Sequence, residues 1–138
     1  MHKLEPGLSA EYLDIVKETN TAAHWGSGGI EVFATPALVA LMESASYLAV
    51  SETLPKGQTT VGGQINVRHL AATPVGMKVR ARAELTAVEG HKLTFNVTAW
   101  DEKEVIGQAE HIRFIIDEAK FMAKVQSKGH APATKKGE

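Results

Sequence analysis

The sequence predicts an α+β fold in which an antiparallel sheet wraps around one long central helix, and three observations support this class. Residues 32–51 are almost entirely apolar and carry a single charge, which is typical of a helix inside a core. Four later segments alternate between apolar and polar residues with the period of a half-buried strand. Turn-forming residues join these segments, and only one long helix is available to cover the apolar face of the sheet.

The first elements are a strand and the long helix. A weakly defined strand is expected around residues 12–17. The helix then begins at Thr35, a favourable N-cap residue, and Pro36, which fits the first helical position because no amide hydrogen is needed there. Two rows of side chains along this helix are apolar, namely Leu38, Leu41, Met42, Ala45 and Leu48, and Val39, Ala40, Tyr47 and Val50. A helix that is apolar on every side is expected to be buried.

Glu43 is the only charged residue within residues 32–51. A buried carboxylate is costly unless it is paired, hydrogen-bonded or protonated, and such carboxylates cluster at functional sites. We therefore interpret Glu43 as a candidate site residue; the alternative is that it simply reaches solvent. A membrane span is not expected, because the stretch is barely long enough and contains Glu43 and Pro36 without basic flanks.

Four strands are expected after the helix, at residues 59–70, 79–87, 93–99 and 105–116. In the first of them, alternation places Val61, Gly63, Ile65, Val67 and His69 on one face. Because His69 shares that face with Ile65 and Val67, it is expected to point toward the helix. His111 and Arg113 in the last strand have ordinary structural interpretations from their sequence context, and His111 is not included among the site residues.

The end of the chain is less regular. Residues 121–125 either continue the last strand or cover one end of the sheet. The tail, residues 126–138, is polar and is expected to be disordered, which leaves residues 1–125 as a single domain.

Composition excludes several functions. A net charge of −1 does not favour nucleic acid or a membrane surface as a partner. The six histidines lack paired metal-ligand spacing, and without cysteine there is no thiolate nucleophile or Cys-based zinc site, so no metal is expected. The first residues lack the apolar run of a signal peptide, so the expected location is the cytoplasm.

A helix wrapped by an antiparallel meander is the organisation of the hotdog fold. A lone subunit would leave a sheet edge and part of the helix uncovered, so a homodimer is expected. Three blocks of the sequence, EVFATPALVALMESAS, NVRHLAATPVGMKVRARAELTAVEG and VIGQAEHIRFII followed by EAKFMAKV, resemble the fluoroacetyl-CoA thioesterase family of hotdog enzymes. The resemblance covers residues 31–125 without a gap.

The resemblance implies a site. The catalytic threonine, glutamate and histidine of the family match Thr35, Glu43 and His69. An arginine of its last strand, near the acyl pocket, matches Arg113, and a glycine early in the strand of the histidine matches Gly62. These roles agree with the residues themselves, because amides and the dipole at a helix N-terminus favour an oxyanion near Thr35. Two mechanisms stay open. Either Thr35 or Glu43 attacks the thioester with help from His69, or Glu43 or His69 activates water while Thr35 orients the substrate.

The chain departs from the family at the lid. Where the fluoroacetyl-specific enzyme has an aromatic residue, this sequence has Gly29, within the glycine-rich segment 26–29 that is typical of a mobile loop. Trp25 and Phe33 are the alternative candidates for an aromatic gate, and Phe33 is also a candidate substrate contact. The expected function is hydrolysis of short-chain acyl-CoA thioesters, with coenzyme A as part of the substrate and no other cofactor. The alternative is a non-catalytic hotdog protein that binds acyl-CoA or another small ligand.

Overall fold

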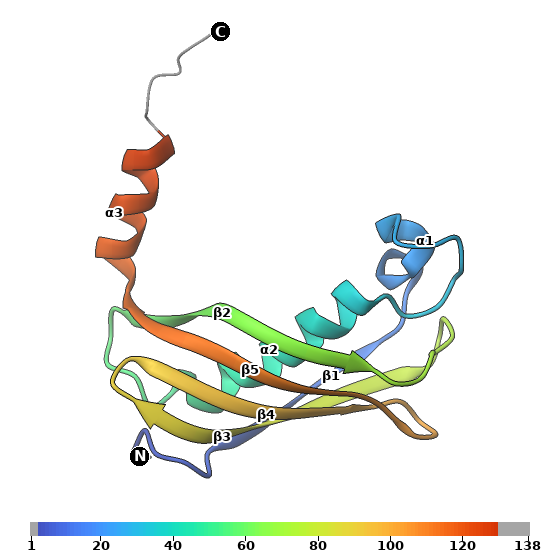
Figure 1. Cartoon of the computed structure of the whole chain (residues 1–138), viewed down its shortest axis with the longest axis horizontal. Helices are drawn as coiled ribbons and strands as arrows, with labels where there is room; N and C mark the ends of the chain where they lie inside the picture. Colours follow the sequence, from blue (N-terminus) through green and yellow to red (C-terminus); the bar gives the residue numbers. More distant parts are fainter. Residues whose placement is uncertain (1–2, 130–138) are drawn as a thin grey trace, which may run out of the picture.

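A five-stranded antiparallel sheet curls around one long helix in the computed structural model, which describes residues 3–129 (Figure 1). The elements in chain order are β1 (Ser9–Ile15), a 3-10 turn η1 (Glu18–Asn20), α1 (Ala22–Trp25), α2 (Thr35–Ser51), β2 (Gln58–His69), β3 (Lys78–Glu89), β4 (Lys92–Trp100), β5 (Val105–Asp117) and α3 (Glu118–Gly129). The strand order is β1-β3-β4-β5-β2, so β1 and β2 form the two edges. The predicted α+β fold class is confirmed.

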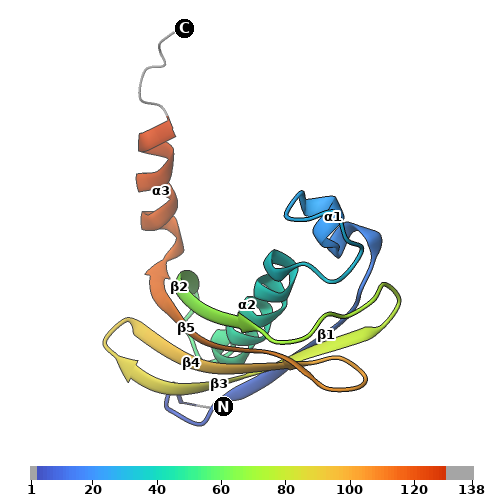
Figure 2. The same cartoon turned by 45° about the vertical axis from the view of Figure 1, so that its right-hand side comes forward.

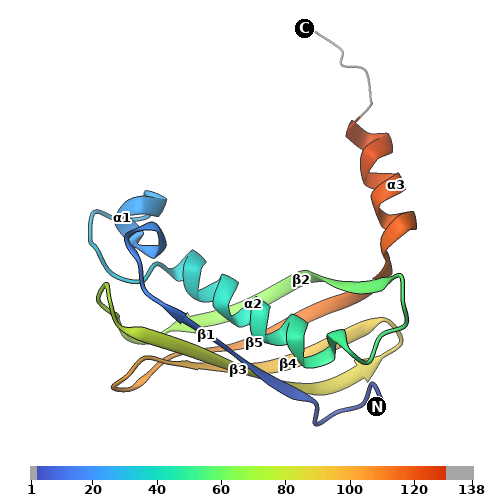
Figure 3. The same cartoon turned by 180° about the vertical axis from the view of Figure 1, so that it is seen from behind.

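The core lies between the sheet and α2, which crosses one face of the sheet (Figure 3). Alternate residues of β3 and β4 face this core, as their sequence pattern predicts: Val79, Ala81, Ala83, Leu85, Leu93, Phe95, Val97 and Ala99 are all buried. Gly107 of β5 allows close approach of the helix, because a Cβ atom there would lie 2.8 Å from Leu38 Cδ2 and 3.0 Å from Met42 Cε. A side chain at this position would have to displace the buried side chains of Leu38 and Met42.

Helix α2 is buried on one side only, which corrects the expectation that it is enclosed all round. Leu38, Met42 and Ala45 are inaccessible, whereas Tyr47 and Leu48 are exposed. Glu43 lies toward the uncovered side, and its side chain is 42% exposed. The physical reason is that a single-layer sheet covers only one side of a helix. The uncovered stripe of α2, defined here as Val39, Ala40, Glu43, Ser44, Tyr47 and Leu48, is partly or fully exposed in the single chain.

A bulge in β2 changes which of its residues face the helix. Pairing with β5 shifts register between Gly62 and Gln64, so Gly63 is the extra residue. Before the bulge, Thr60 is buried and a Cβ at Gly62 would contact the side chain of Glu43 on α2. A Cβ at Gly63 would instead meet the Phe114 ring. The predicted placement of Val61 and Gly63 on the inner face is therefore wrong, while Ile65, Val67 and His69 do share the inner face.

The two ends of the chain also differ from expectation. The first strand lies at Ser9–Ile15 rather than around residues 12–17. Residues 121–125 neither extend β5 nor cover the sheet, because they belong to helix α3. The first turn of α3 is capped by Asp117, whose Oδ1 atom accepts a hydrogen bond from Lys120 N at 3.0 Å. Helix α3 stands away from the sheet and buries no residue (Figure 2). Residues 126–129 are helical, so the predicted disorder is wrong for them, and residues 130–138 lie outside the described part of the chain.

Candidate functional site

Thr35 and His69 meet at the N-terminal end of α2. Thr35 is the first residue of the helix and Ala34 is the N-cap, so the Thr35 hydroxyl does not cap the helix as predicted. It lies 2.8 Å from His69 Nδ1 instead. This pairing is possible because β2 ends at His69 beside the helix N-terminus. A hydroxyl hydrogen-bonded to an imidazole is the arrangement by which a base activates a weak nucleophile.

The protonation of His69 suits a base. Burial lowers the pKa of His69 below its usual value, so the imidazole is neutral at neutral pH. His69 Nε2 is the one buried side-chain nitrogen or oxygen without a hydrogen-bond partner in the part of the chain that the structure describes. When Thr35 donates to Nδ1, the imidazole proton must lie on Nε2. The single chain leaves that N–H group unsatisfied.

Thr35 and His69 line a pocket of about 380 Å³, called here the threonine pocket. Phe33, which is 2% exposed, forms part of its wall, and Ser27 contributes from the glycine-rich segment. That segment is held by main-chain hydrogen bonds from Ala23 N to Ile30 O at 3.0 Å and from Ser27 N to Ala22 O at 3.1 Å. Trp25 is 55% exposed and is absent from the lining of this pocket. Of the two aromatic candidates for contact with an acyl group, only Phe33 lines the threonine pocket.

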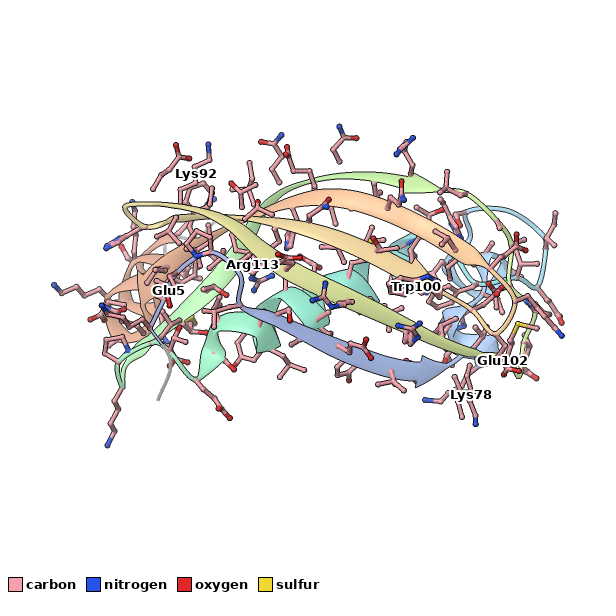
Figure 4. All side chains as sticks on the ribbon, turned by 90° about the horizontal axis from the view of Figure 1, so that it is seen from below. Glu5, Lys78, Lys92, Trp100, Glu102 and Arg113 are labelled. Atoms are coloured by element: carbon pink, nitrogen blue, oxygen red, sulfur yellow. The ribbon has the colours of Figure 1, made fainter. Side chains whose placement is uncertain are left out.

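Glu43, Gly62 and Arg113 line a second pocket of about 510 Å³, called here the glutamate pocket. Glu43 Oε2 lies 3.8 Å from Arg113 Nη1. Arg113 is nearly buried and is held by Thr60, to which it donates from Nε (2.8 Å to Oγ1) and Nη2 (2.9 Å to the carbonyl oxygen). In Figure 4 Arg113 lies within the outline of the sheet and α2, whereas Lys78 and Lys92 project from its periphery. Burial lowers the pKa of Arg113, and the charge of Glu43 opposes that shift.

Gly62 is required by the crowding in the glutamate pocket. A Cβ atom at position 62 would lie 2.6 Å from Glu43 Oε2, 3.3 Å from His111 Cε1 and 3.5 Å from Arg113 Nη1. The absence of a side chain therefore leaves room for the carboxylate beside the guanidinium group.

The structure does not bring all the predicted residues together within one chain. Thr35, His69 and Phe33 share the threonine pocket, and Glu43, Gly62 and Arg113 share the glutamate pocket. Thr35 and Glu43 are eight residues apart on one helix, which corresponds to a rise of about 12 Å. The charged partner of Glu43 within the chain is Arg113, with His111 beside it, rather than His69.

His111 is the residue that the sequence interpretation left out. It is 1% exposed, and its Nε2 atom lies 3.3 Å from Arg113 Nη1 and 4.0 Å from Glu43 Oε2. The alternation of β5 contained the signal, because His111 and Arg113 are two residues apart and so share the inner face. Thr60, Tyr12 and Tyr47 also line the glutamate pocket and were not singled out.

None of the helices between residues 3 and 129 has the length and apolar character needed to cross a membrane.

Two solved structures are similar to this chain over nearly its whole length. The fluoroacetyl-CoA thioesterase FlK superposes with a TM-score of 0.85 at 36% identity, covering 92% of this chain and 98% of that one. A hypothetical protein of Thermus thermophilus, described as a thioesterase superfamily member, has a TM-score of 0.85 at 27% identity, covering 96% of this chain and 100% of that one.

Sequence comparison agrees with the structures. The chain is 45% identical over 98 residues to the fluoroacetyl-CoA thioesterase of Streptantibioticus cattleyicolor, covering 71% of this chain and 70% of that protein. The family model described as FlK, fluoroacetyl-CoA-specific thioesterase, matches residues 16–119. The predicted resemblance and hotdog fold are thus confirmed, and the chain belongs to the FlK family of thioesterases and is a thioester hydrolase.

Proposed function

We propose that this enzyme hydrolyses short-chain acyl-CoA thioesters, with Thr35, Glu43 and His69 as catalytic residues and Gly62, Arg113 and Phe33 as substrate contacts. The observation that carries the proposal is the 2.8 Å contact between Thr35 Oγ1 and His69 Nδ1, at a helix N-terminus that lines a pocket. A hydroxyl, a base and a carboxylate are sufficient for acyl transfer, so no cofactor is proposed beyond the coenzyme A of the substrate. The proposed location is the cytoplasm, as inferred from the sequence.

The proposed mechanism begins with attack of Thr35 Oγ1 on the thioester carbonyl carbon while His69 Nδ1 accepts the hydroxyl proton. The C–S bond breaks, the thiolate of coenzyme A takes the proton, and an acyl-threonine ester remains. Water then hydrolyses that ester, again with His69 as the base. The dipole of α2 favours the oxyanion in both steps. The alternative, direct attack by water that His69 or Glu43 activates, forms no acyl-enzyme, so mass spectrometry of the quenched protein separates the two mechanisms.

A homodimer is proposed because it would unite the two pockets. In a two-fold symmetric dimer the same surface patch of each subunit forms the interface. If residue i of one copy contacts residue j of the other, then residue j of the first copy also contacts residue i of the second. If two α2 helices pack antiparallel with Val39 near the axis, Thr35 (four residues before it) faces Glu43 of the second copy (four residues after it). The uncovered stripe of α2 supports this contact, since Ala40 and Ser44 are small and Tyr47 and Leu48 are exposed apolar residues. The free edge of β2 also favours association.

Complementation between two inactive variants tests the shared site. In a mixed dimer of Thr35→Ala and Glu43→Ala subunits, one of the two sites would contain both native residues. Random mixing makes half of the dimers mixed, so about a quarter of wild-type activity should return after subunit exchange. No recovery, in a sample that light scattering shows to be dimeric, would place the complete site within one chain.

Substrate range is proposed to be broader than that of a fluoroacetyl-specific enzyme. The family's aromatic lid position is occupied by Gly29, and the side chain nearest the threonine pocket in this segment is that of Ser27. Without an aromatic gate, one methylene changes kcat/KM by only about 10- to 200-fold. Acetyl-, fluoroacetyl-, propionyl- and butyryl-CoA should therefore all be hydrolysed. A fluoroacetyl preference of about a thousandfold, roughly 4 kcal/mol, would show that another residue forms the gate.

Release of free thiol from this panel is the primary test, with Thr35→Ala as the inactive variant. Thr53→Ala is the matched control, because Thr53 lies beyond the other end of α2 and its hydroxyl donates to the Val50 carbonyl at 2.7 Å. We expect loss of turnover in the first variant and none in the second. Binding of acyl-CoA without thiol release in the wild-type protein would favour the non-catalytic alternative.

A further inference from the structure

We propose that His111 is a positioning residue that, as a neutral imidazole protonated on Nδ1, holds Arg113 as a hydrogen-bond donor beside Glu43. The proposal rests on the proposed roles of Glu43 and Arg113 in the site. It starts from a buried histidine in β5 that the mechanism above does not use, enclosed by β2, β4 and α2.

The hydrogen bonds decide which nitrogen carries the proton. His111 Nδ1 lies 2.8 Å from the carbonyl oxygen of Gln64, which can only accept, so Nδ1 must donate. Gln64 follows the bulge at Gly63, so this bond also ties the imidazole to the irregular part of β2. The position of the proton is thus set by the backbone rather than by the substrate.

The other nitrogen faces a group that cannot accept. Arg113 Nη1 lies 3.3 Å from His111 Nε2, and a guanidinium group only donates. In the neutral imidazole with Nδ1 protonated, Nε2 has the lone pair that this contact requires. Burial lowers the pKa of His111, and the charge of Arg113 lowers it further, against the opposing effects of the Gln64 hydrogen bond and the Glu43 charge. The net shift of the His111 pKa is downward, so burial and the Arg113 charge, together with the Nη1 contact, favour an unprotonated Nε2.

The consequence is a fixed guanidinium group. Thr60 holds Nε and Nη2 of Arg113, and His111 holds Nη1 from the remaining side. The Nη1 atom is also the one nearest Glu43, at 3.8 Å from Oε2. Without the Nε2 acceptor, Nη1 loses a hydrogen bond and the guanidinium group can rotate about the two bonds to Thr60. The carboxylate of Glu43 would then lose its defined position.

Two isosteric substitutions separate this role from simple packing. In His111→Gln the side-chain amide reaches the place of Nε2, so its oxygen can accept from Arg113. In His111→Asn the amide reaches only the place of Nδ1, so it can donate to Gln64 but leaves Arg113 without an acceptor. We expect kcat/KM to fall by about ten- to a hundredfold in His111→Asn, mostly through kcat, and by much less in His111→Gln. The reverse order, or equal losses with equal melting temperatures, would overturn the proposal.

Nitrogen NMR on the unmodified protein provides a test that needs no activity. The ¹⁵N shifts of His111 should show a protonated Nδ1 and an unprotonated Nε2 at neutral pH, and the Arg113 Nη–H signals should exchange slowly. A proton on Nε2 would refute the proposal even if the protein hydrolyses acyl-CoA. Conversely, the expected tautomer in a protein without thioesterase activity would refute the proposed function and leave the hydrogen-bond assignment intact.

Discussion

Substituting Gly62 by alanine tests the glutamate pocket most directly, because the structure specifies what the added atom would meet. The new Cβ would lie 2.6 Å from Glu43 Oε2, and ordinary contact begins near 3.4 Å. The difference, 3.4 minus 2.6, requires the carboxylate to move by about 0.8 Å. Displacing a catalytic group by about 1 Å costs about a hundredfold in rate, or about 2.7 kcal/mol in the activation barrier.

The effect on stability should be small, which separates it from the effect on activity. Glu43 is partly exposed and its carboxylate is the end of a flexible side chain, so it can move aside. Alanine also restricts the unfolded chain, which stabilises the folded state by about 0.4–1 kcal/mol where the backbone conformation suits it. We therefore expect Gly62→Ala to change the unfolding free energy by less than about 1 kcal/mol while kcat/KM falls about a hundredfold.

Gly63→Ala is the matched control. Its Cβ would clash with the ring of Phe114, which is 40% exposed and lies away from Glu43. In urea titrations this variant should lose as much unfolding free energy as Gly62→Ala, or more, but it should retain most of the wild-type kcat/KM. If Gly62→Ala kept activity within about twofold of wild type, or if both variants lost it equally, the position of the Glu43 carboxylate would not limit catalysis.

Three further predictions concern Glu43, pH and the core. Glu43→Ala should nearly abolish turnover and slightly lower the unfolding free energy, because nearly buried Arg113 loses its carboxylate partner; retained activity would remove Glu43 from the mechanism. The pKa values of His69 and His111 are lowered by burial, so the folded protein binds fewer protons than the unfolded chain below about pH 6.5. The unfolding free energy should therefore fall as pH decreases from about 6.5, by at most about 1.4 kcal/mol per pH unit for each histidine, and the acid limb of kcat/KM should lie below pH 6.5. An unfolding free energy from urea titrations that stays constant between about pH 5 and 6.5, or an acid limb of the rate above pH 6.5, would contradict this. Gly107→Ala should lower the unfolding free energy by about 1–3 kcal/mol, because its Cβ meets Leu38 at 2.8 Å in the core; an unchanged melting temperature would show that the Leu38 and Met42 side chains adjust without cost.

The sequence was sufficient to predict most of the fold because strand and helix patterns are local. Alternation located β3, β4 and β5 to within two residues and identified the buried faces of β3 and β4, whereas the buried face of β5, with His111 and Arg113, was not assigned. The apolar run located α2, and Pro36 marked its start. Glu43 stood out in the sequence as the one charge of the apolar helix, whereas its grouping with Thr35 and His69 came from the resemblance to a family, since residues far apart in sequence have no pattern of their own.

Tertiary structure alone decided how these residues are grouped. The bulge at Gly63 reverses the inner face of β2, and the alternation within β2 does not reveal it, because it is a shift in the register of pairing with β5. The exposure of Glu43 depends on how much of α2 the sheet can cover. The proposed role of His111 depends on two contacts of its ring nitrogens, one with the carbonyl oxygen of Gln64 and one with the guanidinium group of Arg113. Local sequence determines which face of its own helix or strand a side chain occupies. The packing of one element against another determines which groups the side chain contacts on that face. The Thr35–His69 hydrogen bond and the Glu43–Arg113 ion pair both depend on this packing, because each joins α2 to a strand.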